Sequence, residues 1–371
     1  MKLRFKKHVA LTLISLMLLS LIGCGKPAST DTTTTTEAAV TEAPAASISD
    51  AATTADSTPA DASEEGSDAQ TVYPVTVTDQ AGREVTIEKE PESIVSGYYI
   101  STSLLLALGL KDKVTGIEAK ADKRPIYKLA APEFLELPNV GTAKEFDLET
   151  CASLSPELVI LPMKLKDAAQ SLSELDIPVL LVNPESEDQL EQMIELVSTA
   201  TNTKENADVL LSYIDEKKEM LEKDLSGVDA KSVYLAGNSS LLSTAGPAMY
   251  QSGLIELAGG KNAASEITDT YWAEISYEQL LAWDPSYIIL ASDAEYTPED
   301  VLNDENLKEC TAVKNGNVYA IPGDIEALDS PVPGGILASI WLAGILHPDQ
   351  LSADMYTEEK AAFYETFYGI K

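Results

Sequence analysis

The chain has 371 residues, and 44% of them are hydrophobic, which is enough apolar material for more than one buried core. Its formal net charge is −34 at pH 7, so its surface must be strongly acidic. An acidic surface repels a phosphate backbone, and nucleic acid is therefore excluded as a partner.

The first residues predict a secreted lipoprotein. Basic residues precede an apolar stretch over 9–21, which is too short for a bilayer that needs about 20 apolar residues. The stretch ends in "LIGC", where small Gly23 suits a peptidase pocket and Cys24 supplies a thiol for lipidation. We expect a lipoprotein signal peptide over 1–23 and lipidation at Cys24. The alternative is a signal peptide that contains a cysteine by chance.

Residues 24–71 predict a lipidated cysteine followed by a disordered tether. Thr, Ala, Ser, Asp, Glu and Pro dominate this stretch, so it cannot bury enough apolar surface to offset the entropy of ordering. A lipid on Cys24 would hold the protein at the extracellular face of the cell membrane. A tether of this length favours a Gram-positive cell.

The folded part opens with a predicted hairpin and continues as an α/β series. Alternating residues over 75–78 and 84–87 flank a turn at Gly82. The runs "SIVSG", "KVTGIEA", "LVILP" and "VLLVNP" then read as strands, and helices are predicted over 101–108, 148–154, 165–175 and 187–200. This alternation predicts a parallel sheet flanked by helices in a first lobe over 72–202.

A long helix and a second α/β series follow. Apolar residues of 203–225 fall on one helical face, so we expect a connecting helix over 203–226. Strands are predicted over 232–237, 287–292 and 317–322, and helices after Ser276 and near 335–346 and 357–368. The second lobe is therefore expected over 227–371.

Two sequence segments repeat across the predicted lobes. "FDLETCASLSPELVIL" over 146–161 matches "ISYEQLLAWDPSYIIL" over 275–290 in its Glu, its Pro and its apolar triplet. Asp147 and Ser276 are candidate N-caps, which places Glu149 and Glu278 in first helical turns, and Ser276 with Gln279 could form a capping box. The helix dipole alone favours such a carboxylate by about 0.3–1 kcal/mol, so one glutamate would have no functional meaning. The pair predicts equivalent outward positions for a two-armed basic partner.

Taken in order, these features resemble the solute-binding lipoproteins of ABC importers that handle ferric siderophores, haem and cobalamin. The resemblance covers nearly everything after residue 72 and includes the ending "SPVPGGILASIWLAGILHPD". It implies two Rossmann-like lobes joined by one rigid backbone helix, with the ligand in a cleft between them. It also implies that Glu149 and Glu278 dock a monomer onto arginines of an ABC permease dimer, which works with its ATPase.

Candidate ligand contacts follow the predicted strands, since open α/β sheets bind ligands beyond the carboxyl ends of their strands. Aromatic faces there suit a bulky conjugated ligand, and basic groups suit anions. The preferred contacts are Tyr98, Tyr99, Lys164, Asn238, Tyr250 and Trp272. Whether Lys120, Lys123 and Arg124 face the cleft or form a solvated loop stays open.

Cysteine and histidine argue against a bare metal site and a disulfide. Cys151 and Cys310 lie in different predicted lobes and are read as buried thiols. His347 is the only histidine after the signal peptide, whereas bare zinc or manganese sites need several His and carboxylate ligands. We therefore expect no protein-held metal and no cofactor.

The expected function is extracytoplasmic capture of an iron complex of the ferric-siderophore type for an ABC importer. A corrinoid such as cobalamin, haem or an oxyanion remain alternative ligands. A surface lipoprotein without a transport role is the alternative from another class. The sequence has no G-x-S-x-G, H-E-x-x-H, phosphate-loop or G-x-G-x-x-G motif, so we do not expect an enzyme.

Overall fold

The structure is a computed structural model that describes residues 70–268 and 270–371, which lie within one compact unit. The predictions for the signal peptide, for lipidation of Cys24 and for nearly all of the tether lie outside these residues. At the start of the described chain, the Thr71 amide donates to Asn202 Oδ1 at 2.8 Å, and the Thr71 hydroxyl donates to the Thr199 carbonyl at 3.0 Å. The chain is therefore fixed to the first lobe from Thr71 onward.

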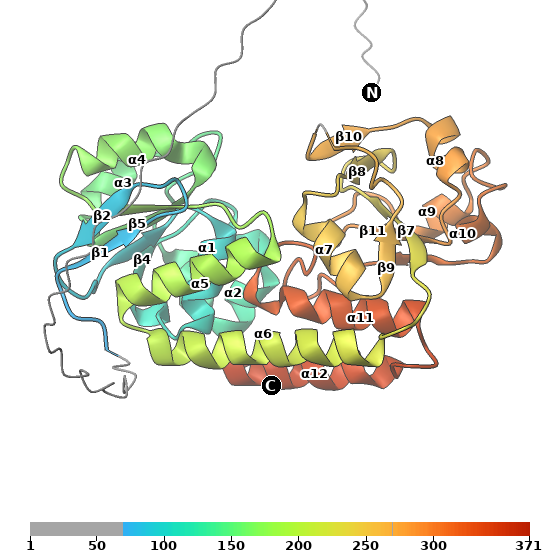
Figure 1. The fold of residues 1–371 in the computed structure, drawn as a ribbon. Helices are drawn as coiled ribbons and strands as arrows, with labels where there is room; N and C mark the ends of the chain where they lie inside the picture. The colour runs from blue at the N-terminus through green and yellow to red at the C-terminus, as the bar shows by residue number, and fades with distance from the viewer. Residues whose placement is uncertain (1–69, 269) are drawn as a thin grey trace, which may run out of the picture. The chain divides into compact units, whose positions relative to one another are not determined.

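The first lobe is a parallel sheet with a hairpin at its edge (Figure 1). The hairpin pairs β1 (Val75–Thr78) with β2 (Glu84–Ile87), as predicted. The sheet order is β4 (Val114–Gly116), β3 (Ile94–Ser96), β5 (Leu158–Pro162) and β6 (Val179–Val182), all parallel. Every residue of β3, β5 and β6 is buried, which explains why these strands read as continuous apolar runs.

Helices cover the first sheet at the predicted places, with one addition. The α-helices are α1 (Tyr99–Ala107), α2 (Pro125–Ala130), α3 (Leu148–Ser153), α4 (Lys166–Ser173) and α5 (Glu187–Thr201). Short 3-10 helices are η1 (Lys111–Lys113), η2 (Ala121–Lys123), η3 (Pro132–Glu136) and η4 (Met163–Leu165). Helix α2 was not predicted, and it starts directly after the basic segment at 120–124.

The connecting helix α6 (Lys204–Asp224) carries the chain from the first lobe to the second (Figure 1). Its buried apolar residues are Ala207, Leu210, Ile214 and Leu221, which lie on the predicted face. This stripe packs into the same core cluster as residues of both lobes. Burial of an apolar face, rather than helix propensity, therefore stabilises α6.

The second lobe repeats the strand order of the first. Its parallel sheet runs β12 (Val318–Ala320), β11 (Tyr287–Leu290), β7 (Lys231–Ala236) and β9 (Gly260–Asn262). Read from the other end, this is the order of the first sheet, with β9, β7, β11 and β12 at the places of β4, β3, β5 and β6. The repeated sequence segments therefore build the same unit, since β5 follows α3 and β11 follows α8.

Further elements complete the second lobe. A two-stranded ribbon pairs β8 (Ser243–Ala245) with β10 (Trp272–Glu274). The helices are α7 (Tyr250–Leu257), α8 (Tyr277–Trp283), α9 (Pro298–Leu302), α10 (Thr311–Lys314), η5 (Pro333–Gly335), α11 (Ile336–Leu346) and α12 (Ala353–Tyr368). Helix α12 packs against α11 and also against α1 of the first lobe. The predicted fold class, two α/β lobes joined by one long helix, is confirmed.

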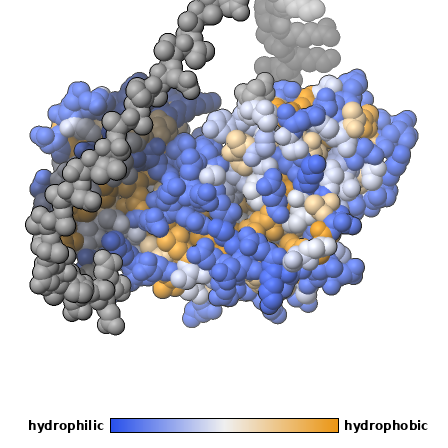
Figure 2. All heavy atoms as spheres, in the orientation of Figure 1, coloured by the Kyte–Doolittle hydropathy of each residue, from blue (hydrophilic) through white to orange (hydrophobic). Residues whose placement is uncertain are grey.

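Cysteine and histidine lie in the interior. Cys151 and Cys310 are both buried and free, as predicted. His347 is buried, and its Nε2 lies 3.0 Å from the Gly259 carbonyl oxygen. On the face shown in Figure 2, hydrophilic residues cover much of both lobes, as the strong acidic charge requires.

Candidate functional site

The two lobes meet at a narrow pocket. The first lobe contributes Tyr99, Arg124 and Ile126 to its lining, and the second contributes Asp293 and Ile325. Its cavity volume is about 30 Å³, which is small beside the roughly 300–1,000 Å³ typical of ligand pockets. The Ile126 amide closes one side by donating to the Ile325 carbonyl at 3.1 Å. The lobes are therefore in direct contact at the base of the cleft.

Arg124 is the notable cation of this pocket. Its guanidinium carbon lies 3.9 Å from the centre of the Tyr99 ring, a cation–π contact that fixes the side chain. Among the residues that the structure describes, no carboxylate lies within 4 Å of the guanidinium nitrogens. Lys123 also lines the pocket, but it pairs with Asp122 at 3.3 Å. Arg124 therefore keeps its charge-assisted hydrogen bonds available for an anionic group.

The sequence left open whether the basic residues at 120–124 face the cleft, and the structure places them differently. Lys123 and Arg124 line the interlobe pocket, whereas Lys120 does not and is exposed. The cause is local, because Lys120 has a left-handed backbone with a φ of 69° that turns the chain into η2. Helix α2 then starts at Pro125, which places Arg124 at its N-cap.

Tyr98 and Tyr99 lie at the carboxyl end of β3, at the start of α1. Their rings meet edge to face with centroids 5.4 Å apart, and both are partly buried. The Tyr99 hydroxyl donates to Ser330 Oγ at 2.9 Å, so this tyrosine also bridges the lobes. Tyr99 and Arg124 are therefore brought together by the fold, with Tyr98 beside them.

The other predicted contacts are more scattered. Lys164 in η4 and Asn238 after β7 are exposed, and Trp272 on β10 is 39% exposed. None of the three lines the narrow interlobe pocket, so their role as ligand contacts stays a prediction.

Tyr250 is placed differently from what the sequence suggested. It is the first residue of α7, not a loop residue, and is only 5% exposed. A Cβ added at Gly335 would lie 2.1 Å from its hydroxyl oxygen, which shows how closely η5 covers it. In this conformation η5 covers the Tyr250 hydroxyl, and the role of Tyr250 as a ligand contact stays a prediction.

Sequence reasoning missed three buried carboxylates, of which Glu326 lines the pocket. Glu118, Glu326 and Asp329 are each at most 8% exposed. Burial raises the pKa of all three carboxyls, while hydrogen bonds from neighbouring hydroxyls act in the opposite direction. Those hydroxyls belong to Thr102 and Tyr127 at Glu118 and to Ser292 at Asp329. No local pattern marks these acids, since their partners are distant in sequence or on other elements.

The two repeated glutamates occupy equivalent exposed positions. Glu149 and Glu278 are each the second residue of their helix, α3 and α8. The predicted caps are confirmed, because Asp147 accepts from the Thr150 amide at 2.9 Å and Ser276 accepts from the Gln279 amide at 3.2 Å. Hydrogen bonds from its own amide and from Ser276 lower the pKa of Glu278.

The predicted capping box at α8 is wrong. Its second half would require Gln279 to reach back to the Ser276 backbone, but the Gln279 amide group instead lies 3.5 Å from Glu266 Oε1. Trp283 Nε1 donates to the same glutamate oxygen at 2.8 Å. Glu266 therefore draws the glutamine side chain away from the helix start.

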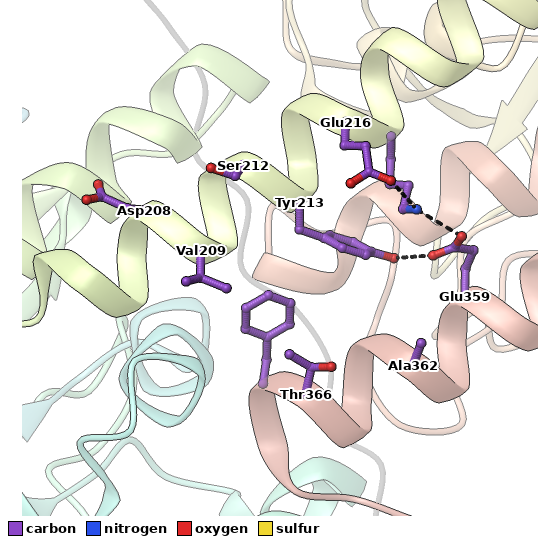
Figure 3. Close-up of a pocket in the computed structure, with 10 residues that line it drawn as sticks. Asp208, Val209, Ser212, Tyr213, Glu216, Glu359, Ala362 and Thr366 are labelled. Atoms are coloured by element: carbon purple, nitrogen blue, oxygen red, sulfur yellow. Dashed lines mark hydrogen bonds and ion pairs between the residues drawn. The ribbon is translucent and has the colours of Figure 1, made fainter.

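A pocket larger than the interlobe one lies elsewhere, between α6 and α12 (Figure 3). Its volume is about 700 Å³, and four of its polar side chains are paired with one another. Lys217 Nζ lies 2.9 Å from Glu359 and 3.1 Å from Glu216, and the Tyr213 hydroxyl donates to Glu359 at 3.0 Å. None of the predicted ligand contacts lines it, so we do not assign it as the ligand site.

Two absences among the described residues, 70–268 and 270–371, bear on the class of site. No group of three or more His, Cys, Asp or Glu side chains there is arranged to hold a metal ion. No helix in the same residues has both the length and the apolar character needed to cross a membrane.

Two α/β lobes on one connecting helix, with an interlobe pocket and exposed acids at equivalent places, define a solute-binding protein of the ABC-transporter type. Residues 94–325 match the family model described as periplasmic binding protein, and the chain belongs to that family. Its family and fold are those of substrate-binding proteins and not of enzymes.

Relatives differ in the ligands that their names state. YvrC of Bacillus subtilis, described as an uncharacterized ABC transporter substrate-binding lipoprotein, is 29% identical over 70% of this chain and 82% of its own. The molybdate-binding protein MolA of Haemophilus influenzae is 24% identical over 79% and 90%, and its molybdate-bound structure has a TM-score of 0.71 over 80% and 98%. The petrobactin-binding protein YclQ of Bacillus subtilis is 23% identical over 66% and 79%.

Proposed function

We propose that this chain captures an anionic iron complex, of the ferric-siderophore type, between its lobes and delivers it to an ABC permease dimer. The observation that carries the proposal is Arg124, which is held on the Tyr99 ring without a carboxylate partner among the described residues. A half-buried guanidinium between the lobes is stabilised by an anion that brings its own acceptors. Siderophores that bind iron through catecholate or carboxylate oxygens supply such groups.

The ligands named for the relatives do not belong to one chemical class. Petrobactin is the named ligand of YclQ, whereas MolA is named for molybdate, an oxyanion. We favour the iron complex because the tyrosine pair at the start of α1 offers a ring surface that a bulky chelate can use and a small oxyanion cannot. No protein-held cofactor is part of the proposal, and the iron is cargo.

A titration panel tests the ligand. The purified protein is titrated with ferric petrobactin, ferric citrate, sodium molybdate, cyanocobalamin and haemin, and binding is followed by calorimetry and tryptophan fluorescence. We expect ferric petrobactin or ferric citrate to bind with micromolar or tighter affinity. Binding of molybdate, cyanocobalamin or haemin alone would replace the iron proposal, and a panel without any binding would favour a surface lipoprotein that has no transport role.

We also propose that the protein is lipid-anchored at Cys24 on the extracellular face of the membrane. The support is the "LIGC" sequence and the lipoprotein description of YvrC. Cells grown with an alkyne fatty acid should yield labelled protein, and the Cys24→Ala variant should be unlabelled and released into the medium. An equally labelled, membrane-retained variant would contradict the anchor.

A further inference from the structure

A set of contacts, which we call the interlobe seam, joins the lobes at the base of the cleft. Its first-lobe residues are Tyr99, Ser103 and Ile126, and its second-lobe residues are Ile325, Glu326 and Ser330. Tyr99 and Ser103 stand one turn apart on α1, so both face the segment over 325–330. The seam is therefore a small contact of helices α1 and α2 with one segment of bends and turns over 325–330.

The second-lobe side of the seam is anchored in its own lobe. Asp329 accepts a hydrogen bond from Ser292, which follows β11. The Gln251 side-chain amide on α7 donates to the Asp329 carbonyl at 2.8 Å. A movement of the second lobe away from the first must therefore pull this segment off α1.

Glu326 is the only carboxylate whose side chain crosses the seam among the described residues. It is 6% exposed, and no cation of the described residues lies within 4 Å of it. Its Oε1 accepts from Ser103 of α1, and its Oε2 accepts from the Tyr364 hydroxyl of α12 at 3.2 Å. The Tyr368 hydroxyl lies 2.9 Å from Ser103 Oγ and completes a hydroxyl cluster around the acid.

The groups that face Glu326 leave its charge only partly compensated. Helix α1 presents the Ser103 hydroxyl, and α12 presents two phenols whose own pKa values are raised, so they stay neutral. The η5 turn brings the Gly334 backbone close, because an added Cβ there would lie 3.2 Å from Oε2. Arg124 acts from the start of α2 only through space. An ionised Glu326 in the closed seam therefore has donors but no contacting counter-ion.

We propose that closing the cleft takes up one proton at Glu326, so that the interlobe seam is a proton-dependent latch between the lobes. In the closed form the protonated carboxyl donates to a neighbouring hydroxyl oxygen, and the hydroxyl cluster reorients to accept it. In an open form water reaches the carboxylate, which then ionises as an ordinary glutamate does. As a control of cargo release, this latch rests on the proposed function, but the seam itself can be measured without cargo.

The direction of the pH effect follows from proton linkage. Burial, the dominant cause, raises the pKa of Glu326 from its ordinary 4.5 to about 7. Between these pH values the closed seam binds a proton that the open seam does not, so closure weakens as pH rises through this window. The opening constant should increase on the order of 100-fold between pH 4.5 and 7 and become constant above about pH 7.

The Ile126 amide reports the seam directly, because it donates across it to Ile325. We suggest measuring its hydrogen exchange by NMR in the ligand-free full chain from pH 4.5 to 8.5, normalised to the intrinsic exchange rate at each pH. The Val159 amide, which donates to the Pro178 carbonyl at 2.9 Å inside the first lobe, is the reference. We expect protection of Ile126, but not of Val159, to fall across the window.

Two variants test the assignment to Glu326. Glu326→Gln should make Ile126 protection independent of pH. Glu118→Gln is the matched control, because Glu118 is also buried but bonds only to Thr102 and Tyr127 of the first lobe, so it should keep the wild-type profile. A flat wild-type profile, or an unchanged profile in Glu326→Gln, would overturn the latch.

A milder variant keeps the test valid if Glu326→Gln fails to fold. Ser103→Ala removes one donor to the ionised carboxylate, which should raise the pKa of Glu326 further and extend the pH window upward. An unshifted window would overturn the proposal. Because no cargo is present, these results are independent of the titration panel: a failed panel leaves the latch standing, and a failed latch leaves the ligand proposal standing.

Discussion

At the scale of single residues, Arg124 links the fold to the choice of ligand. The residue lies at the N-cap of α2, stacks on Tyr99 and faces the second lobe. Tyr99 in turn donates to Ser330 of the second lobe. A guanidinium that is held in this way loses little further side-chain entropy when it binds an anion.

Arg124→Gln should weaken binding of ferric petrobactin by about 10- to 100-fold, the usual worth of a hydrogen bond to a charged group. Calorimetric titration measures the change. Lys128→Gln is the control, because Lys128 is exposed on the same helix, carries the same charge and does not line the pocket. Equal affinity of wild type and Arg124→Gln would remove this arginine from the binding site.

At the scale of elements, the η5 turn shows how glycine permits close packing at the seam. Gly334 brings the backbone against Glu326, and Gly335 brings it against Tyr250. Neither glycine has a positive φ, so the backbone angle does not require glycine. Glycine is needed because a side chain would have no room at either position. The η5 turn therefore packs closely against helix α7, which it covers.

Gly335→Ala should lower the free energy of unfolding by about 1–3 kcal/mol, because the new methyl group would collide with the Tyr250 hydroxyl. Adding Tyr250→Phe should restore part of the loss, since it deletes the atom in closest contact. Gly253→Ala on α7 is the control: nothing lies within 4 Å of its Cβ position, and alanine should stabilise the helix by about 0.5–1 kcal/mol. Urea unfolding measures all three.

Elements with their own pattern could be predicted from the sequence, and those defined by a distant partner could not. The run "LVILP" is buried along its whole length and was predicted as β5. By contrast, β10 has only three residues, "WAE", and exists because it pairs with β8. Short strands of this kind lack the alternation or apolar length that marks a strand.

The same reasoning explains the site. Glu149 and Glu278 could be found because each carries its cap in the adjacent sequence. From the sequence alone, Glu326 would be taken for a surface residue. Its hydrogen-bond partners are distant in sequence, since Ser103 lies 223 residues earlier and Tyr364 lies 38 residues later, so its neighbours in the chain do not indicate that it is buried. The burial of Tyr250 could not be predicted for a related reason, because η5, which covers it, is more than 80 residues away.

At the scale of the whole molecule, the two sheets share one strand order, and the two exposed glutamates sit on the same unit of each lobe. Such a pair matches a partner that is itself a dimer. Charge-assisted contacts at two separated points set orientation and association rate more than affinity. The docking role of the glutamates remains a proposal.

Glu149→Ala combined with Glu278→Ala should leave cargo affinity unchanged and impair uptake by cells that depend on this protein. Uptake of radioactive iron complex measures the effect. Glu205→Ala with Glu222→Ala is the control, because it removes the same charge from exposed positions on α6. Normal uptake by the first double variant would exclude docking through these residues.

The lobes share one covalent link, α6, and that link is a continuous helix of 21 residues, about 31 Å long. A hinge made of extended loops allows wide rotation of the lobes through a few backbone torsions. A helix resists bending because bending strains its backbone hydrogen bonds. Large rotations of one lobe relative to the other are therefore excluded, and only small tilts of the lobes remain. The opening and closing that we propose is therefore a small tilt of one lobe against the other, and the stiffness of α6 limits the range of cargo sizes that the protein can hold.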